Sequence, residues 1–206
     1  MTIHSSLKVG GIILCGGKSE RMGQPKLSLP FGDELMLQRV VRILAEIVCP
    51  IIVVAAGDQQ LPELPTEVQI AYDEVNHLGP LGGMSAGLDV LEGQADAAFI
   101  SGCDTPLLQP TFVQFMIDSL ESYELAVPRE ENFFHPLAAV YRVHLQQKIK
   151  DLVATNRMRP LFLIEESHSN RVDVQQLRTV DPELNSLKNI NNQDDYQSAL
   201  QQCGFG

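Results

Sequence analysis

Short apolar runs that alternate with amphipathic helical segments constrain the fold of this chain more than any other feature of its sequence. Runs rich in β-branched residues predict strands at 9–15, 50–56, 68–72, 97–101, 125–128 and 137–142. Apolar residues at helical spacing predict helices at 35–48, 81–91, 111–120, 143–154 and 192–202. Asp33 is the expected N-cap of the first helix, and Pro110 is expected in the first turn of the third. The alternation predicts an α/β fold, a three-layer sandwich around a mostly parallel, Rossmann-like sheet.

The length of 206 residues fits a single domain over 1–206, since domains commonly hold about 100–200 residues. The alternation is less regular from 130 to 187, so some antiparallel structure is expected there. In open α/β sheets, ligands bind beyond the carboxyl ends of the strands. This rule selects the loops after Cys15, Ala56, Tyr72 and Ser101 as the expected binding edge.

Acidic residues outnumber basic ones by 26 to 15, which gives a formal net charge of −11. Proteins that coat nucleic acids or bind anionic membranes need a basic face, so neither partner is expected. An anionic metabolite would instead need a local cluster of basic side chains and glycine amides. The four cysteines form no CxxC pair and no targeting segment is visible, so a reducing, cytoplasmic location is expected.

A local cluster of basic residues and glycines follows the first predicted strand. The loop contains three glycines and three basic residues: Gly16, Gly17, Gly23, Lys18, Arg21 and Lys26. Glycines let main-chain N–H groups approach a ligand closely, and successive amides form an anion-binding concavity. The loop fits neither a Walker A motif nor GxGxxG, so it indicates polyphosphate binding of another kind. The alternative is an ordinary glycine turn with a solvated basic face.

Two carboxylates follow predicted strands at the same edge. Asp104 comes after the strand at 97–101 and stands two residues before Pro106. A carboxylate that faces a phosphate loop is well placed to hold Mg²⁺, which prefers oxygen ligands and substrate phosphates. The alternative for Asp104 is an Asx-type turn before the proline. Asp73 follows the strand at 68–72, and its alternative is a simple strand-end turn.

The loop sequence LCGGKSERMGQPK resembles the L-x-G-G-x-S-x-R-M-G-x-x-K signature of the molybdenum cofactor guanylyltransferase family, with eight matching positions. Further segments resemble this family in the same order along nearly the whole chain: Asp73, Gly79–Gly83 (GPLGG), Cys103–Pro106 (CDTP), His135–Leu137 with Tyr141 and Arg142, and Asn189–Asn191 (NIN). Two positions depart from the family pattern. Cys15 stands where alanine is usual, and Pro25 stands where aspartate is usual.

The resemblance implies the nucleotide-diphospho-sugar transferase-like fold and transfer of GMP from GTP to molybdenum-bound molybdopterin, with release of pyrophosphate. It implies catalytic roles for Lys26, Asp104 and Arg21, and a magnesium ion on Asp104. The nucleotide-binding residues that it implies are Leu14, Cys15, Gly16, Gly17, Lys26, Asp73, Gly79, Pro80, Leu81 and Asp104. The residues that it implies for the pterin substrate are Gly23, His135, Asn189 and Asn191, although His135 fits a surface or packing role equally well. Transient contacts with molybdenum-insertion or molybdoenzyme maturation proteins also fit this reading.

Two kinds of alternative remain open at this point. The same chemistry could act on other substrates, as in a molybdopterin cytidylyltransferase or a sugar-phosphate nucleotidyltransferase. The Gly16-Gly17 pair favours guanylyl transfer, because the cytidylyl relatives more often have Ala-Ala-Gly there. The other alternative is a non-catalytic nucleotide-binding regulator, since a fold alone does not determine function. Asp104 and Lys26 argue against that alternative.

Overall fold

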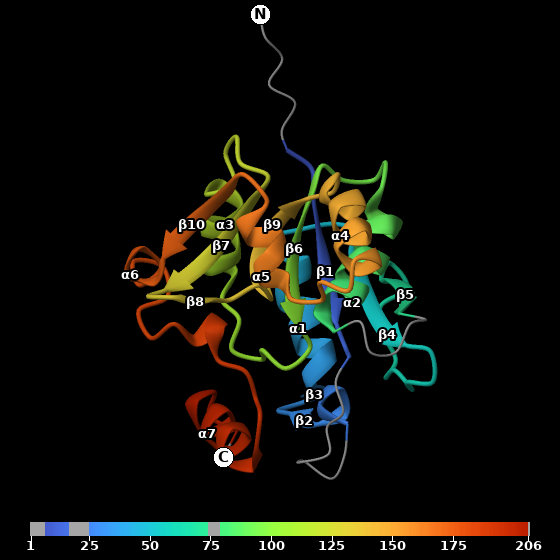
Figure 1. Ribbon diagram of the computed structural model, residues 1–206. Coiled ribbons are helices and arrows are strands. Elements are labelled where there is room, and N and C mark those ends of the chain that lie inside the picture. Colours follow the sequence, from blue (N-terminus) through green and yellow to red (C-terminus); the bar gives the residue numbers. More distant parts are fainter. Residues whose placement is uncertain (1–6, 17–24, 74–78, 206) are drawn as a thin grey trace, which may run out of the picture.

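A mixed β-sheet forms the centre of the protein, seen in a computed structural model that describes residues 7–16, 25–73 and 79–205 (Figure 1). The sheet has eight strands in the order β10-β7-β9-β6-β1-β4-β5, with β8 paired to β7. The strands are β1 Val9–Leu14, β4 Ile51–Ala56, β5 Gln69–Asp73, β6 Ala97–Gly102, β7 Leu125–Glu130, β8 Phe133–Phe134, β9 Ala138–Arg142 and β10 Ser169–Asp173. β1 pairs in parallel with β4 and β6, β4 with β5, and β7 with β10.

Within the eight-stranded sheet, every antiparallel pairing involves β8 or β9, which lie in the later part of the chain. β9 runs antiparallel to both β6 and β7, and β8 runs antiparallel to β7. The expectation of antiparallel structure after residue 130 is therefore confirmed. Because β9 reverses direction between β6 and β7, the carboxyl end of β7 returns to the same edge as the carboxyl ends of β1 and β6.

Helices cover both faces of the sheet and complete three layers. The helices are α1 Met36–Ala45, α2 Pro80–Leu91, α3 Pro110–Asp118, α4 Leu145–Ala154, α5 Pro160–Glu165, α6 Val174–Leu177 and α7 Gln193–Gln202. α1, α3 and α6 pack on one face in a core cluster with Ile13, Val53 and Phe99. α2, α4 and α5 pack on the other face in a cluster with Ile12 and Ile52. The predicted α/β sandwich is confirmed. Among the described helices, none is long and apolar enough to cross a membrane.

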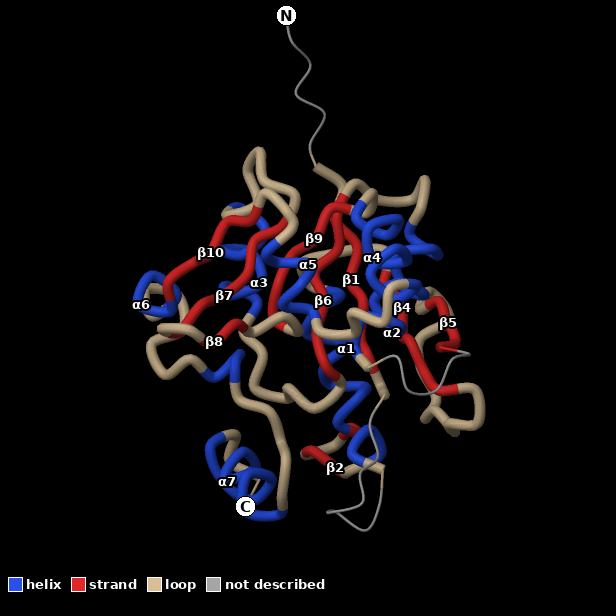
Figure 2. Tube along the Cα trace, in the orientation of Figure 1, coloured by secondary structure: helices blue, strands red, loops and turns tan. Residues whose placement is uncertain are grey.

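The last helix packs away from the sheet, against a small hairpin (Figure 2). The hairpin consists of β2 Pro30–Phe31 and β3 Glu34–Leu35, which follow the 3₁₀ helix η1 Lys26–Ser28. Phe31 and Tyr196 share a third apolar cluster, and the Tyr196 hydroxyl donates to the main-chain oxygen of Pro30. A second 3₁₀ helix, η2 Asn185–Leu187, precedes the segment that leads into α7.

Asp33 does not cap the first helix, so that prediction is wrong. Gly32 has φ +66°, and together with Asp33 it forms the tight turn between β2 and β3. A glycine adopts this backbone conformation without steric cost, which makes the dipeptide a hairpin turn. The residue before α1 is Leu35, whose main-chain N–H donates to Gln38 Oε1 over 2.9 Å. The helix ends at Ala45, three residues earlier than predicted.

Two glycines in β1 let helices approach it closely from opposite faces. A Cβ atom at Gly10 would lie 2.8 Å from Leu91 Cδ2 in α2, and one at Gly11 would lie 2.6 Å from Leu44 Cδ2 in α1. Successive residues of a strand face opposite sides of the sheet, so Gly10 faces the layer of α2 and Gly11 faces the layer of α1. β1 is therefore held between the two helical layers at close range.

We predict that Gly11→Ala lowers the free energy of unfolding by about 1–3 kcal/mol, because the added methyl group overpacks the contact with Leu44. Urea denaturation monitored by circular dichroism measures this change. Gly57→Ala is the control, since a Cβ atom there would meet no atom of the described residues within 4 Å. Equal stability of the two variants would contradict the close approach described above.

Candidate nucleotide-binding site

A cavity of about 490 Å³ opens at the carboxyl ends of the parallel strands. Its lining residues come from the carboxyl ends of β1, β4, β5 and β6, from the residues that follow β1, β4 and β6, from the start of α2, and from three other segments of the chain. They are Leu14, Cys15, Gly16, Lys26, Leu27, Val54, Ala55, Ala56, Gln59, Asp73, Gly79, Pro80, Gly83, Gly102, Cys103, Asp104, Leu137 and Asn189. The predicted binding edge is the edge at which the cavity lies.

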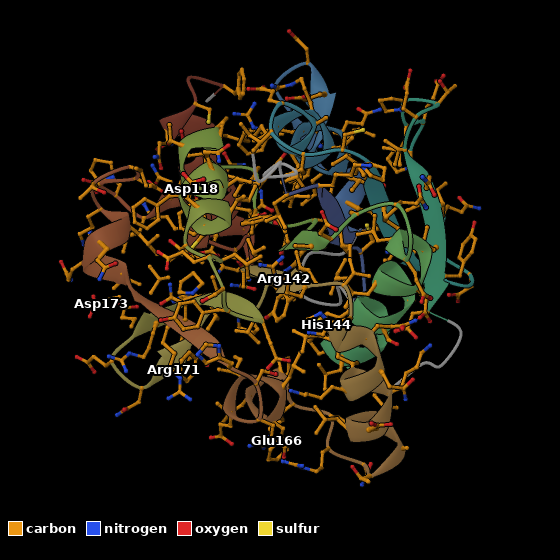
Figure 3. All side chains as sticks on the ribbon, turned by 90° about the horizontal axis from the view of Figure 1, so that it is seen from above. Asp118, Arg142, His144, Glu166, Arg171 and Asp173 are labelled. Carbon is orange, nitrogen blue, oxygen red and sulfur yellow. The ribbon has the colours of Figure 1, made fainter. Side chains whose placement is uncertain are left out.

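The opposite edge of the sheet carries charged residues that are paired with nearby loops. Figure 3 looks onto this edge, where Arg142 and His144 are labelled. Arg142 lies at the amino end of β6, opposite Ala97, and donates to the main-chain oxygen of Glu121 over 2.7 Å. His144 Nε2 lies 3.4 Å from Glu124 Oε1. These charges serve loop packing far from the cavity.

An ion pair joins two loops of the cavity that are far apart in sequence. Lys26 Nζ donates to Asp104 Oδ2 over 2.9 Å and to Asn191 Oδ1 over 3.4 Å. The Lys26 and Asp104 side chains are each 19% exposed, so the pair is partly shielded from solvent and still reachable by a ligand. The sequence prediction placed Lys26, Asp104 and Asn191 in one site, and the fold brings all three together.

The main chain holds Asp104 in place. The N–H of Cys103 donates to Leu14 O over 3.0 Å, and the N–H of Ile190 donates to Asp104 O over 2.9 Å. The turn is closed by Thr105, whose hydroxyl donates to Gly102 O over 3.0 Å. The Asp104 carboxylate makes no hydrogen bond to this turn, so an Asx-type turn is not its role. Its atom Oδ1 accepts no hydrogen bond from the part of the chain that the structure describes.

The segment before α7 brings two asparagines to the site. Asn189 lines the cavity, and Asn191 contacts Lys26. The segment is anchored by the first turn of α7, where Asp195 Oδ2 accepts from the main-chain N–H of Asn191 over 2.8 Å. The side chain of Asn192 caps the helix by accepting from the N–H of Asp195 over 2.9 Å. The helix cap therefore fixes the main chain from which Asn191 extends.

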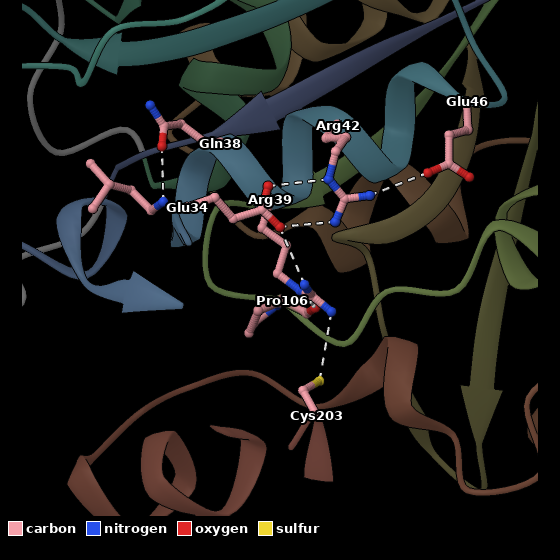
Figure 4. A network of polar contacts seen from close by, with 8 residues as sticks. Glu34, Gln38, Arg39, Arg42, Glu46, Pro106 and Cys203 are labelled. Carbon is pink, nitrogen blue, oxygen red and sulfur yellow. Dashed lines mark hydrogen bonds and ion pairs between the residues drawn. The ribbon is translucent and has the colours of Figure 1, made fainter. Parts of the chain in front are cut away.

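A polar network around Arg39 connects α1, the loop after β6 and the C-terminal segment (Figure 4). Arg39 Nε donates to Pro106 O over 2.7 Å, Nη1 donates to Glu34 over 3.2 Å, and Nη2 lies 3.6 Å from Cys203 Sγ. Glu34 also accepts two hydrogen bonds from Arg42. The hydrogen bond and charge of Arg42 lower the pKa of Glu34, with a smaller contribution from Arg39 and partial opposition from burial. The network supports the loop that carries Asp104.

Cys15 and Cys103 lie in the wall of the cavity as buried neighbours. The hydrogen bond with Cys15 and burial raise the pKa of the Cys103 thiol well above its ordinary range. A thiol in this environment stays protonated and is a poor nucleophile. The cysteines therefore contribute packing and shape to the cavity.

The remaining predicted residues have different positions. Leu14, Cys15, Gly16, Asp73, Gly79 and Pro80 line the cavity, while the Leu81 side chain is fully buried in the core beneath α2. His135 lies in the loop between β8 and β9, outside the cavity lining, with its ring edge-on to Phe133. Burial lowers the pKa of His135, and the charge of Glu130 opposes this effect. Gly17, Arg21 and Gly23 lie outside the described residues.

Gln59 and residues 54–56 belong to the cavity lining but were not among the predicted site residues. After β4 the chain has a single glycine, Gly57, and no basic residue before Gln59, so it carries no glycine-rich or basic signature of a ligand site. The available signal was the rule that ligands bind at strand ends, which had selected the loop after Ala56 without naming its residues.

The protein has the architecture of a nucleotide-binding α/β protein. Its sheet is partly parallel, and the cavity at the carboxyl edge of that sheet contains a lysine paired with a carboxylate. Residues 11–172 match the family model described as "MobA-like NTP transferase domain", and the chain belongs to this family of nucleotidyltransferases.

Relatives and solved structures extend this assignment. The chain is similar to a probable molybdenum cofactor guanylyltransferase of Mycobacterium avium (35% identity, 95% of this chain and 97% of the relative). It is also similar to one of Methanosarcina mazei (29% identity, 92% and 88%). The crystal structure of molybdopterin-guanine dinucleotide biosynthesis protein A from Archaeoglobus fulgidus shares the fold, with a TM-score of 0.80 at 21% identity over 95% of this chain and 98% of that one.

We predict that Glu34→Gln lowers the melting temperature by about 2–4 °C at neutral pH. The pKa of Glu34 is depressed below its ordinary value of 4.5 in the folded protein, so its stabilising effect is fully present above that pH. The effect is lost as the pH falls through the folded-state pKa, and the difference between variant and wild type should shrink there. Differential scanning calorimetry between pH 7 and pH 3 measures it.

Glu46→Gln is the control for this prediction. Glu46 pairs with Arg42 at the exposed end of the same network, and its side chain is 52% exposed. Exposed pairs of this kind contribute little, so this variant should melt close to the wild type at every pH. A Glu34 variant whose deficit stays constant with pH would show that shape, and not charge, gives Glu34 its effect.

Proposed function

We propose that this chain transfers GMP from GTP to the phosphate of molybdenum-bound molybdopterin, forming the guanine dinucleotide cofactor and pyrophosphate. The observation that carries this proposal is the Lys26–Asp104 pair at the carboxyl edge of β1 and β6, in a cavity lined by glycines. Relatives at 29–35% identity over most of the chain are named probable molybdenum cofactor guanylyltransferases, which supports the choice of substrates.

In this reaction an oxygen of the pterin phosphate attacks the α-phosphorus of GTP, and the bond from that phosphorus to the bridging oxygen of pyrophosphate breaks. Both reactants are anions, so catalysis consists mainly of positioning and of charge stabilisation. Lys26 would contact the phosphates through Nζ after giving up part of its contact with Asp104. The amide of Gly16 would contribute a further donor, since Gly16 lines the cavity and no atom of the described residues lies within 4 Å of a Cβ position there.

The donor set of the site fits Mg²⁺. Asp104 offers a hard carboxylate with Oδ1 unused by the described residues, and no group of three or more acidic, His or Cys residues among them forms a closed metal cage. Magnesium is commonly held by one or two carboxylates together with substrate phosphates. When bound, the ion would neutralise phosphate charge beside Lys26. Asn189 and Asn191 would contact the pterin substrate from the other side of that pair.

The alternatives make different demands on the site. A cytidylyl or sugar-phosphate transferase would use the same ion pair but would select another base. A non-catalytic regulator would need no carboxylate beside the lysine. The Lys26 and Asp104 side chains contact each other, which supports an enzyme. The selectivity for the base can be measured directly.

We predict that GTP with Mg²⁺ raises the melting temperature more than ATP, CTP or UTP does at the same concentration. A ligand that binds the native state stabilises it according to its affinity and concentration. A thermal-shift series with the four nucleotides measures this. The largest shift with CTP would make the protein a cytidylyltransferase and overturn the guanylyl assignment.

We predict that Asp104→Asn lowers Mg²⁺-dependent GMP transfer by about 10²-fold or more, because it removes the charge that holds the metal and orients Lys26. Release of pyrophosphate across a Mg²⁺ titration measures the loss, and circular dichroism verifies the fold. Cys103→Ser is the matched control on the adjacent residue and should keep most of the activity, with a modest loss of stability. Full activity of the Asn variant at ordinary Mg²⁺ would exclude the metal role, and an inactive Ser variant would require thiol chemistry.

A further inference from the structure

Gln59 links the ends of two neighbouring strands through its side-chain amide. It lies in the turn after β4, where its main-chain N–H donates to Ala56 O over 3.0 Å. Its Nε2 donates to Cys15 O over 2.9 Å, and its Oε1 accepts from the main-chain N–H of Ala56 over 3.3 Å. The half-buried Gln59 therefore spans the loops after β1 and β4 and lines the cavity.

These two partners leave the amide only one orientation. The carbonyl of Cys15 can only accept a hydrogen bond, and the N–H of Ala56 can only donate one. A rotated amide would place oxygen against oxygen and N–H against N–H, at the cost of both hydrogen bonds. The position of the amide nitrogen of Gln59 is therefore fixed by the main chain and does not depend on a ligand.

One donor of this fixed amide remains unused. A glutamine side chain carries two N–H donors on one nitrogen. Cys15 accepts one of them, and within the described ranges 7–16, 25–73 and 79–205 no group accepts the other. A preoriented N–H on a cavity-lining side chain is suited to an acceptor atom of a bound ligand.

The strand order places Gln59 at the end of the cavity away from the ion pair. β1 lies between β4, which precedes Gln59, and β6, which precedes Asp104. Adjacent strands are about 4.8 Å apart, so the two loops are separated by about 10 Å. The cavity lining includes the apolar residues Leu14, Val54 and Pro80, and Asp73 lines it from the strand next to β4. With phosphates at Lys26, the end of the cavity near Gln59 is where the flat nucleobase would lie.

We propose that Gln59 determines the base selectivity of the site by donating its free N–H to the exocyclic oxygen of the base, which is O6 in guanine. Adenine and cytosine carry an amino group at the corresponding position, so a donor would face a donor there. A polar group that is left unpaired in this way disfavours the wrong ligand strongly. The inference rests on the proposed function for the identity of the nucleotide, and it adds the residue that would select it.

The test is calorimetric titration of the intact chain with GTP, ITP and ATP in the presence of Mg²⁺ and without pterin. ITP keeps the 6-oxo group of guanine but lacks its 2-amino group. Gln59→Met removes the donor at nearly constant length, and Gln59→Glu replaces it with an acceptor. Gln60→Ala is the control on the adjacent, exposed glutamine. Circular dichroism and melting temperature establish that each variant is folded.

We expect both Gln59 variants to lower the ratio of GTP to ATP affinity by about tenfold, and the ratio of ITP to ATP affinity by the same factor. Gln60→Ala should leave both ratios unchanged. Unchanged ratios in the Gln59 variants would overturn the proposal, whether all three affinities stay the same or fall together. An equal fall of all three affinities would mean that Gln59 only stabilises the loops after β1 and β4.

A parallel titration with UTP and CTP keeps this proposal separate from the proposed function. If the wild-type protein binds a pyrimidine nucleotide best, guanylyl transfer fails as the function. The role of Gln59 is then tested on UTP and CTP, which carry an oxo and an amino group at the same ring position. A ratio of UTP to CTP affinity that Gln59→Met leaves unchanged would overturn the role of Gln59 in that case also.

Discussion

The parallel pairing of β1 with β6 is the constraint on which the site depends. Six residue pairs, from Val9 opposite Ala97 to Leu14 opposite Gly102, bring both strands to the same edge in register. The hydrogen bond from the Cys103 N–H to Leu14 O carries this register one step beyond the sheet. The two loops consequently begin side by side, and an ion pair forms between residues 78 positions apart. A shift in this register would separate Lys26 from Asp104.

The C-terminal segment adds a second layer of support to the same pair. Ile190 is fixed to the main chain of Asp104, and Asn191 reaches Lys26 from the far end of the chain. The segment is held in turn by the cap of α7 and by the Arg39 network, which joins α1 to Pro106 and Cys203. Residues far from the cavity thus determine where its polar atoms lie. This supporting role accounts for the position of α7 outside the sandwich.

The sequence predicted those parts of the fold that have strong local signals. β1, β4 and β6 are buried on both faces, so they appear as nearly continuous apolar runs, and the strand-end rule placed Asp104 beside the glycine loop. β10 was missed because its sequence SNRVD buries only Val172. The prediction that Asp33 caps the first helix failed because Asp33 lies with Gly32 in the turn of the β2–β3 hairpin. Gln59 could not be predicted, since its role follows from a turn geometry that pairs it with Cys15.

The charges of the cavity show how an acidic protein can serve a nucleotide. Among the described lining residues there is one cation, Lys26, beside two carboxylates, Asp73 and Asp104, so their formal sum is negative. A nucleoside triphosphate is itself strongly anionic, and these side chains alone would repel it. Productive binding therefore needs positive charge beyond that of the described lining residues, and a divalent metal on Asp104 would supply it at the β6 end. At the β4 end, where Asp73 lies opposite Ala56, the base is neutral and needs no added positive charge, and Gln59 offers it directional hydrogen bonding.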